Sequence, residues 1–171
     1  LIPIKMRFKN WKPYLPPAVI GGQNMELLFQ GLSIAATGET DFDKFPIPYR
    51  AVATDLATGT AVILGSGSLS TAMRASMSIP GIFPPVELNG TPLADGGMAA
   101  NFPIQIARKL GADVIIGVDI STPLRTKEQL GSLFTRIDQV TGLLTNGNKE
   151  ADMAAVRPQD VILVPDLADI T

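Results

Sequence analysis

The pattern of apolar and polar residues predicts strands and helices that alternate along the chain. Residues 1–8 alternate apolar and basic side chains, as a strand does, and a connection rich in proline and glycine follows over 11–24. A short helix is expected over 25–33. Residues 49–56 and 60–64 are predicted to form a hairpin, because a turn-forming Ala-Thr-Gly segment separates them.

A helix is predicted over 69–78, directly after the segment Gly65-Ser66-Gly67. Ser68 or Ser70 can cap it, since a serine hydroxyl accepts a hydrogen bond from an N–H group of the first turn. Phosphate binding by this glycine-rich segment is the weaker alternative, because the lysine and third glycine of the known phosphate loops are missing. The apolar residues at core spacing are Ala72, Met73 and Met77.

Further along the chain, Asn89-Gly90 lies between the apolar runs 86–88 and 91–93, which predicts a hairpin with a type I′ turn. A helix is expected to begin with Asn101 as its cap and to end at Gly111. Its buried stripe would consist of Ile104, Ala107 and Leu110.

The last third of the chain contains two continuous apolar runs, 114–118 and 161–164, on either side of an amphipathic helix over 128–144. A strand that is apolar on both faces and lies next to such a helix is typical of a parallel sheet covered by helices. The sequence therefore predicts the α/β class. The expected stripe of the helix consists of Leu130, Leu133, Phe134, Ile137, Val140 and Leu144.

Composition favours a single domain with a real core: the chain has 171 residues, 46% of them hydrophobic, and a formal net charge of -2. Because it is weakly acidic, no nucleic-acid partner is expected. It contains neither an apolar run long enough to span a bilayer nor a signal peptide. Since strand patterns lie at both ends, we expect both ends to be cut from a longer polypeptide.

Histidine and cysteine are both absent. Within this chain, that excludes a Ser-His-Asp triad, a Cys-His pair and the histidine and cysteine zinc sites. The acidic cluster Glu39, Asp41 and Asp43 lacks the spacing of a calcium loop. We therefore expect no metal and no cofactor, and acid–base work falls to carboxylates, lysine, tyrosine or hydroxyl groups.

Asp95 is the candidate catalytic base. Gly96 and Gly97 follow it directly, and residues without a Cβ allow another chain segment to approach the backbone closely. The ordinary alternative is a turn, because Asp-Gly-Gly also suits a chain reversal. A serine nucleophile of the G-x-S-x-G type is not found. The nearest match, Gly31 to Ala35, comes after residues 27–29, which are predicted to be helical, and it ends in alanine.

Residues 75–85 form a rigid apolar loop with three prolines and one glycine. Such a loop can line a site for an acyl chain. Packing beneath the neighbouring hairpin is an equally good interpretation, since apolar loop residues are often simply buried. The candidate acyl-pocket residues are Ser76, Ile79, Pro80, Ile82 and Phe83.

Taken together, four motifs closely resemble the bacterial patatin-like phospholipases in order and spacing. They are the segments 50–56, 75–80, 83–85 and 95–97, the last with Asn101 and Pro103. The resemblance runs from about Trp11 to Asp166. Residues 10–24 resemble most closely the secreted members, in which the patatin domain precedes an outer-membrane barrel.

The resemblance implies a three-layer α/β/α sandwich with a mainly parallel central sheet and a hydrolase that cleaves lipid acyl esters with a Ser/Asp dyad. Asp95 would be the dyad aspartate, with Gly96 and Gly97 completing its motif. The family's glycine-rich oxyanion loop and G-x-S-x-G serine are missing, so residues 1–171 would be the C-terminal part of one patatin-like domain. On its own this part is expected to be inactive.

The expected partners are a phospholipid or fatty-acyl ester, the N-terminal segment with the nucleophilic serine, transiently a membrane surface, and a second copy in a homodimer. A secreted or cell-surface location is favoured over the cytoplasm. Two alternatives stay open: a catalytically inactive phospholipid-binding module, which lacks G-x-S-x-G upstream, and a structural subunit, whose melting temperature no lipid would alter.

Overall fold

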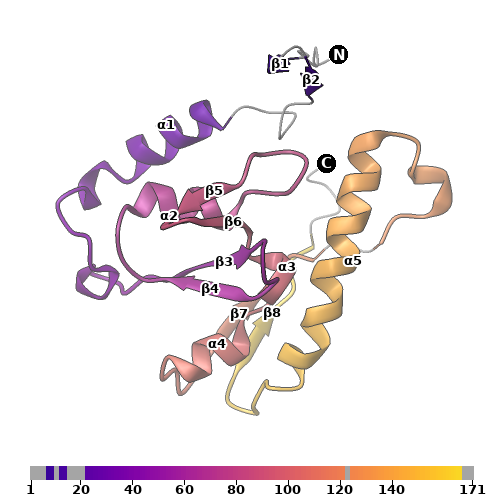
Figure 1. Ribbon diagram of the computed structural model, residues 1–171. Helices are drawn as coiled ribbons and strands as arrows, with labels where there is room; N and C mark the ends of the chain where they lie inside the picture. Colours follow the sequence, from indigo (N-terminus) through magenta and orange to yellow (C-terminus); the bar gives the residue numbers. More distant parts are fainter. Residues whose placement is uncertain (1–6, 10–11, 15–21, 122–123, 167–171) are drawn as a thin grey trace. The chain divides into compact units, whose positions relative to one another are not determined.

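The computed structural model describes residues 7–9, 12–14, 22–121 and 124–166. The chain divides into two compact units, Leu1–Gly96 and Gly97–Thr171, each with its own helices and strands (Figure 1). In the described part of the chain, no helix combines the length and the apolar content that crossing a membrane requires.

The first unit is built on a four-stranded sheet in the order β4-β3-β6-β5, in which every neighbouring pair is antiparallel. β1 and β2 form a separate antiparallel pair. The elements in chain order are β1 (Arg7–Lys9), β2 (Lys12–Tyr14), α1 (Gln23–Leu32), the short 3-10 helices η1 (Ile34–Ala36) and η2 (Phe42–Lys44), β3 (Ala51–Asp55), β4 (Ala61–Leu64), α2 (Leu69–Ser76), β5 (Val86–Leu88) and β6 (Thr91–Asp95).

Small side chains let α2 pack closely on β3 and β6. The buried cluster of this unit consists of Phe42, Ala51, Ala53, Leu64, Ala72, Ala75 and Leu93. The alanines come from β3 and α2, so the helix and the strand meet through methyl groups. At the edge of the cluster the ring of Phe42 stacks on that of Phe45, with 5.1 Å between the ring centroids.

The predicted turns of the first unit are confirmed. Asn89 and Gly90 have φ angles of 52° and 79°, as a type I′ turn requires, and join β5 to β6. Ser68 is the N-cap of α2, and its hydroxyl accepts a hydrogen bond from the Thr71 N–H. Gly65-Ser66-Gly67 is thus the turn that leads into a capped helix.

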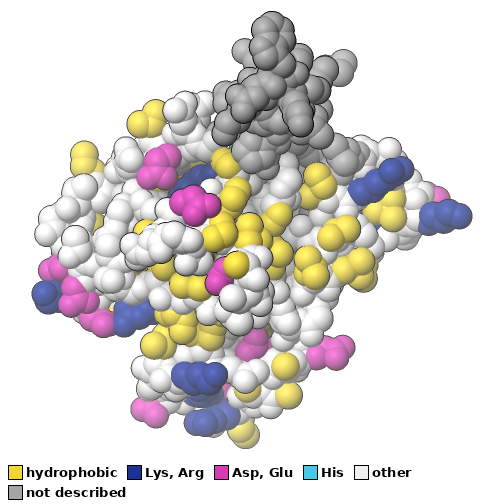
Figure 2. All heavy atoms as spheres, viewed as in Figure 1, with side chains coloured by type: hydrophobic (Ala, Val, Ile, Leu, Met, Phe, Trp, Pro, Cys, Tyr) yellow, Lys and Arg dark blue, Asp and Glu magenta, His cyan; other side chains and the backbone are white. Residues whose placement is uncertain are grey.

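The second unit combines helices with a parallel pair of strands, β7 and β8. α5 packs against α3 and α4. The elements are α3 (Gly97–Ala100), α4 (Ile104–Lys109), β7 (Ile116–Val118), η3 (Lys127–Gln129), α5 (Leu133–Met153) and β8 (Val161–Leu163). Exposed hydrophobic residues of α5 include Val140, Leu143 and Leu144, and hydrophobic side chains are visible on this helix in Figure 2.

The α/β class is confirmed, but the expectation of a mainly parallel sheet is wrong for the four-stranded sheet. Short turns join β3 to β4 and β5 to β6, and a tight hairpin can join only antiparallel strands. In the described residues, parallel pairing is found between β7 and β8, which a long helical connection joins. The three-layer arrangement stays a prediction.

Several predicted details of the helices and strands are wrong. α2 ends at Ser76, and its buried apolar residues are Ala72 and Ala75, with Met73 and Met77 only half-buried. Pro103, not Asn101, occupies the N-cap of α4, without a side-chain hydrogen bond. Differences of one turn arise because side-chain spacing alone does not determine where a helix ends. The expected buried stripes are also wrong at Leu110, Val140 and Leu144, which are exposed.

The run 114–118 was expected to be buried on both faces, and this is also wrong. Of the strand β7, only Gly117 is buried, against Phe102 and Ile162, whereas Ile116 and Val118 are exposed. On β8, Val161 and Leu163 lie opposite these two residues and are exposed as well. Among the described residues of the second unit, the side chains on one face of this pair are therefore exposed.

Asp160 anchors the second unit through a buried ion pair with Arg108. Its carboxylate also accepts hydrogen bonds from the N–H groups of Arg157, at 2.7 Å, and Ile115, at 2.9 Å. Burial alone would raise the pKa of Asp160, but the hydrogen bonds from Arg157, Arg108 and Ile115 outweigh it and lower the pKa to about 2. The carboxylate is therefore charged in the folded protein at all but strongly acidic pH.

We expect this group to make stability depend on acid pH. The pKa of an aspartate in an unfolded chain is about 3.9. Because the folded pKa is lower, the stabilisation is fully present above about pH 4 and is lost as the pH falls toward about 2. Urea unfolding at stepped pH should give a steeper loss of unfolding free energy for the wild type than for Asp160→Asn.

Some pH dependence will remain in Asp160→Asn, since the pKa of Asp119 is also lowered, to about 2. The matched control is Glu87→Gln, at an exposed residue of β5. It should keep the wild-type slope. Identical slopes for the wild type and Asp160→Asn would contradict the prediction.

Candidate functional site

Asp95 is the last residue of β6 and is held by its backbone on two sides. Its N–H group donates to the Ser78 carbonyl at 3.0 Å, and its carbonyl accepts from the Thr54 hydroxyl at 2.7 Å. Thr54 is buried, and Asp95 pairs with Ala53 of β3. The main chain from which the carboxylate projects is therefore fixed, while the residue itself is half-buried.

Gly96 confirms the expectation that a residue without a Cβ is needed directly after Asp95. A Cβ at this position would lie 2.0 Å from the Val52 carbonyl oxygen, a backbone atom that cannot move aside. The Gly96 N–H group donates to the Ser76 carbonyl at 3.2 Å. Only glycine allows the chain to leave β6 so close to β3.

The turn interpretation of Asp95-Gly96-Gly97 holds for Gly96, which forms a turn between β6 and α3. β6 continues through Asp95, and Gly97 is the first residue of α3. The motif thus joins a strand to a helix instead of reversing the chain between two strands. A carboxylate at such a strand end is a typical place for a functional side chain, although position alone does not assign its role.

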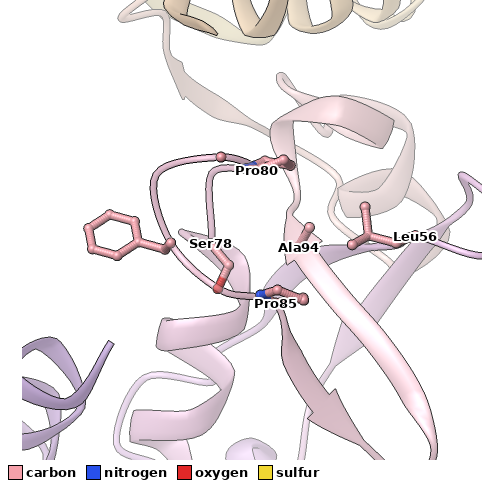
Figure 3. Close-up of a pocket in the computed structure, with 7 residues that line it drawn as sticks. Leu56, Ser78, Pro80, Pro85 and Ala94 are labelled. Atoms are coloured by element: carbon pink, nitrogen blue, oxygen red, sulfur yellow. The ribbon is translucent and has the colours of Figure 1, made fainter. Parts of the chain in front are cut away.

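A small apolar cavity lies beside the end of β6. Its volume is about 150 Å³. The walls come from the loop after α2 and from the ends of β3 and β6, and Figure 3 shows them. The lining residues are Leu56, Ser78, Pro80, Gly81, Phe83, Pro85 and Ala94. This composition suits a hydrocarbon group and offers few polar contacts.

The cavity and the candidate base lie near each other in sequence but on different faces of the strand. Successive strand residues point to opposite faces, so the side chain of Asp95 shares a face with Ala53, and that of Ala94 shares a face with Thr54. An extended group in the cavity would therefore reach the carboxylate only around the end of β6.

Of the five predicted acyl-pocket residues, the structure places Pro80 and Phe83 in the cavity wall, whereas Ser76, Ile79 and Ile82 do not line it. Ser76 is the last residue of α2, and its carbonyl accepts from Gly96. Sequence reasoning missed Ser78, which lines the cavity and is fully buried. It also missed Leu56 and Ala94. These two residues line the cavity because β3 pairs with β6, and the local sequence pattern does not show that pairing.

A second polar cluster follows β7 in the other unit. The Lys149 ammonium lies 2.5 Å from Asp119 Oδ2 and 2.8 Å from the Ser121 hydroxyl, which in turn donates to Asp119 Oδ1 at 2.6 Å. The hydrogen bonds from Lys149 and Ser121 lower the pKa of Asp119 to about 2. The Lys149 ammonium is thus held between the Asp119 carboxylate and the Ser121 hydroxyl.

The remaining candidates are occupied by structural contacts. Asp43 forms an ion pair with Arg50 at 2.7 Å, and Asp41 caps η2 through the Asp43 N–H. Ser33 follows the helix α1 and donates its hydroxyl hydrogen to the Phe29 carbonyl, so it does not lie on a strand-to-helix turn. Within the described ranges, no group of three or more acidic, histidine or cysteine side chains could hold a metal ion.

Comparison with known proteins places these features in a family context. A family model described as patatin-like phospholipase matches residues 6–108. An uncharacterised NTE family protein of Mycobacterium tuberculosis is 42% identical over 84 residues, which cover 49% of this chain and 23% of that protein. Another, from Mycobacterium bovis, is 37% identical over 146 residues, covering 85% of this chain and 24% of that protein.

Similarity extends to eukaryotes. Lysophospholipase NTE1 of the yeast Meyerozyma guilliermondii is 32% identical over 107 residues, which cover 60% of this chain and 7% of that protein. The chain therefore matches about a quarter or less of the length of each of these curated relatives.

The Gly96 contact gives a prediction about stability. Gly96→Ala should lower the free energy of unfolding by about 3 kcal/mol or more, because its Cβ would overlap the β3 backbone. The control is Gly31→Ala in α1, where no atom lies within 4 Å of the added Cβ. It should raise stability by up to about 1 kcal/mol. Chemical denaturation measures both, and a Gly96→Ala protein of wild-type stability would refute the contact.

Proposed function

This chain belongs to the patatin-like phospholipase family, and we propose that it is part of a lipid acyl ester hydrolase of the phospholipase A or lysophospholipase type. The observation that carries the proposal is the geometry of Asp95. Its backbone is anchored on two sides at the end of β6, directly before a position that only glycine can occupy. The relative from Meyerozyma guilliermondii is named a lysophospholipase, which supports the choice of substrate class.

In the proposed mechanism Asp95 acts as the base toward a serine on an N-terminal segment of the same domain. The carboxylate takes the hydroxyl proton as the serine oxygen attacks the ester carbonyl, and the alcohol leaves with that proton. Water then attacks the acyl-enzyme and gives a proton to Asp95, which passes it to the serine oxygen as the acyl–serine bond breaks and the fatty acid leaves. Residues 1–171 would supply the C-terminal part of the domain, including Gly96 and Gly97, and would be inactive alone.

A carboxylate is a weak base toward a serine hydroxyl, so positioning has to supply much of the rate. General-base and oxyanion contributions are each typically about two to four orders of magnitude. The two backbone hydrogen bonds of Asp95 favour such positioning, since they leave the main chain little freedom. The chemistry needs no metal or cofactor.

The cavity next to β6 is the proposed acyl site. Pro80 and Phe83 form apolar walls there, together with Leu56 and Ala94. Because the side chains of Ala94 and Asp95 point to opposite faces, the acyl chain would bend around the end of the strand. The ester would then lie near the carboxylate while the hydrocarbon lies in the cavity.

The proposed subtype and location of the protein rest on the sequence resemblance. Residues 10–24 favour the secreted bacterial type with a following barrel, and with it a cell-surface location and transient contact with a membrane. A homodimer is the proposed assembly. A three-layer sandwich would be completed by the segment that carries the serine.

Replacement of the base is the direct test. In the full-length enzyme, Asp95→Asn should lower kcat for a fatty-acyl ester by about 100- to 10,000-fold, because the amide cannot accept the serine proton. The melting temperature should change little. Ester hydrolysis is measured as the rate at which fatty acid is released, and circular dichroism monitors folding.

Asp113→Asn is the matched control, since Asp113 is exposed in the second unit. It should retain wild-type activity. If Asp95→Asn remained fully active, Asp95 would not be the base. If the wild type bound phospholipid vesicles without any hydrolysis, the protein would be a binding module instead.

A further inference from the structure

Arg74 is a buried cation in the middle of the first unit. It lies on α2, and only 4% of its surface is exposed. In the part of the chain that the structure describes, no carboxylate lies within ion-pair distance of its guanidinium. Burial lowers the pKa of Arg74, and the negative charge of Glu26 acts in the opposite direction. An arginine kept in such a place has to be held by other contacts.

Among the described residues, the hydrogen-bond acceptors and the aromatic ring that hold the guanidinium come from the loop between α2 and β5. One terminal nitrogen donates to the Ser78 hydroxyl, and the other donates to the Pro84 carbonyl at 3.1 Å. The guanidinium carbon lies 5.3 Å from the centre of the Phe83 ring, within the range of a cation–π contact. Arg74 thus touches both ends of the loop and an aromatic ring between them.

Ser78 connects Arg74 to Asp95. It is fully buried, and its hydroxyl donates back to the Arg74 carbonyl at 2.6 Å. The Ser78 carbonyl accepts the N–H of Asp95. Ser78 also lines the apolar cavity (Figure 3). Phe83 is another lining residue. Two bonded contacts therefore lead from the guanidinium to the residue that carries the candidate base.

We propose that Arg74 is a positioning residue: through Ser78 it holds the strand end that carries Asp95, and through Pro84 and Phe83 it holds the wall of the adjoining cavity. The expected effect of Arg74 on catalysis rests on the proposed function. Its contacts with Ser78, Pro84 and Phe83, which we call the clamp, do not. Arginine suits this role because its planar group donates in two directions and stacks on an aromatic ring at the same time.

Lysine could not replace it. An ammonium is a single point of charge, so it cannot bond to Ser78 and Pro84 with the same spacing or stack on Phe83. Arg74→Lys therefore keeps the charge and most of the volume but removes the clamp. Its charge should still be tolerated, which keeps the variant folded.

Gly22 offers a second way to disturb the clamp without changing Arg74. A Cβ at Gly22 would overlap the guanidinium, with 3.1 Å to its central carbon. Gly22 has a φ of -73°, so alanine fits the backbone there. Gly22→Ala should thus displace the arginine side chain from the Pro84 carbonyl.

The test combines amide hydrogen exchange with kinetics of the full-length enzyme. In Arg74→Lys and Gly22→Ala, the N–H groups of Asp95 and Gly96 should exchange at least about ten times faster than in the wild type, because their acceptors at Ser78 and Ser76 lose support. The paired amides of β3 and β4 should keep their wild-type rates. For a short-chain ester, kcat should fall at least about ten-fold with little change in KM, as expected for a misplaced base.

Arg50→Lys is the control, since it makes the same substitution in a surface ion pair with Asp43. It should alter neither exchange at Asp95 nor kcat. Unchanged exchange at Asp95 in both clamp variants would overturn the proposal. If exchange rose while Asp95→Asn left hydrolysis intact, the clamp would stand and the catalytic assignment would fail.

Discussion

The close approach of Gly96 to β3 is the contact on which the geometry of the site depends. Because no side chain separates Gly96 from the Val52 carbonyl, β6 stays in register with β3 up to its last residue. That register places Asp95 opposite Ala53 and allows the Thr54 hydroxyl to reach the Asp95 carbonyl. On the other edge of β6, the carbonyls of Ser78 and Ser76 accept hydrogen bonds from the N–H groups of Asp95 and Gly96, which lie beyond the pairing with β5. A larger residue at position 96 would push β6 away from β3 and weaken all of these contacts at once.

The loop after α2 both holds the end of β6 and forms a wall of the cavity, and Ser78 takes part in both. Ser78 bonds to the strand end with its carbonyl and to Arg74 with its hydroxyl, and its side chain faces the cavity. A rigid loop with three prolines can combine these roles because its backbone loses little freedom when it is ordered. Core, cavity and candidate base are therefore coupled through one short segment, and a change in any of them is felt by the others.

Local sequence signals predicted the local features. Asn89-Gly90 determined the hairpin, Ser68 the start of α2, and the glycine after Asp95 the close backbone contact. Features that depend on distant pairing escaped prediction. The adjacency of β3 and β6 joins segments about forty residues apart, so neither Leu56 nor Ala94 could be identified as a cavity residue. Arg74 was missed for another reason: helical periodicity treats an arginine as a surface residue, whereas here the loop folds over it.

The uncovered face of β7 and β8 has a consequence for how the second unit behaves in solution. Parallel strands are normally covered on both faces, yet Ile116, Val118, Val161 and Leu163 are all exposed on one face of this pair. Any molecule that covers this face binds the folded unit and not the unfolded chain, so by mass action it adds to the stability of the fold. The free energy of unfolding of this unit is then not a constant of its sequence. It depends on the concentration of whatever covers those four side chains.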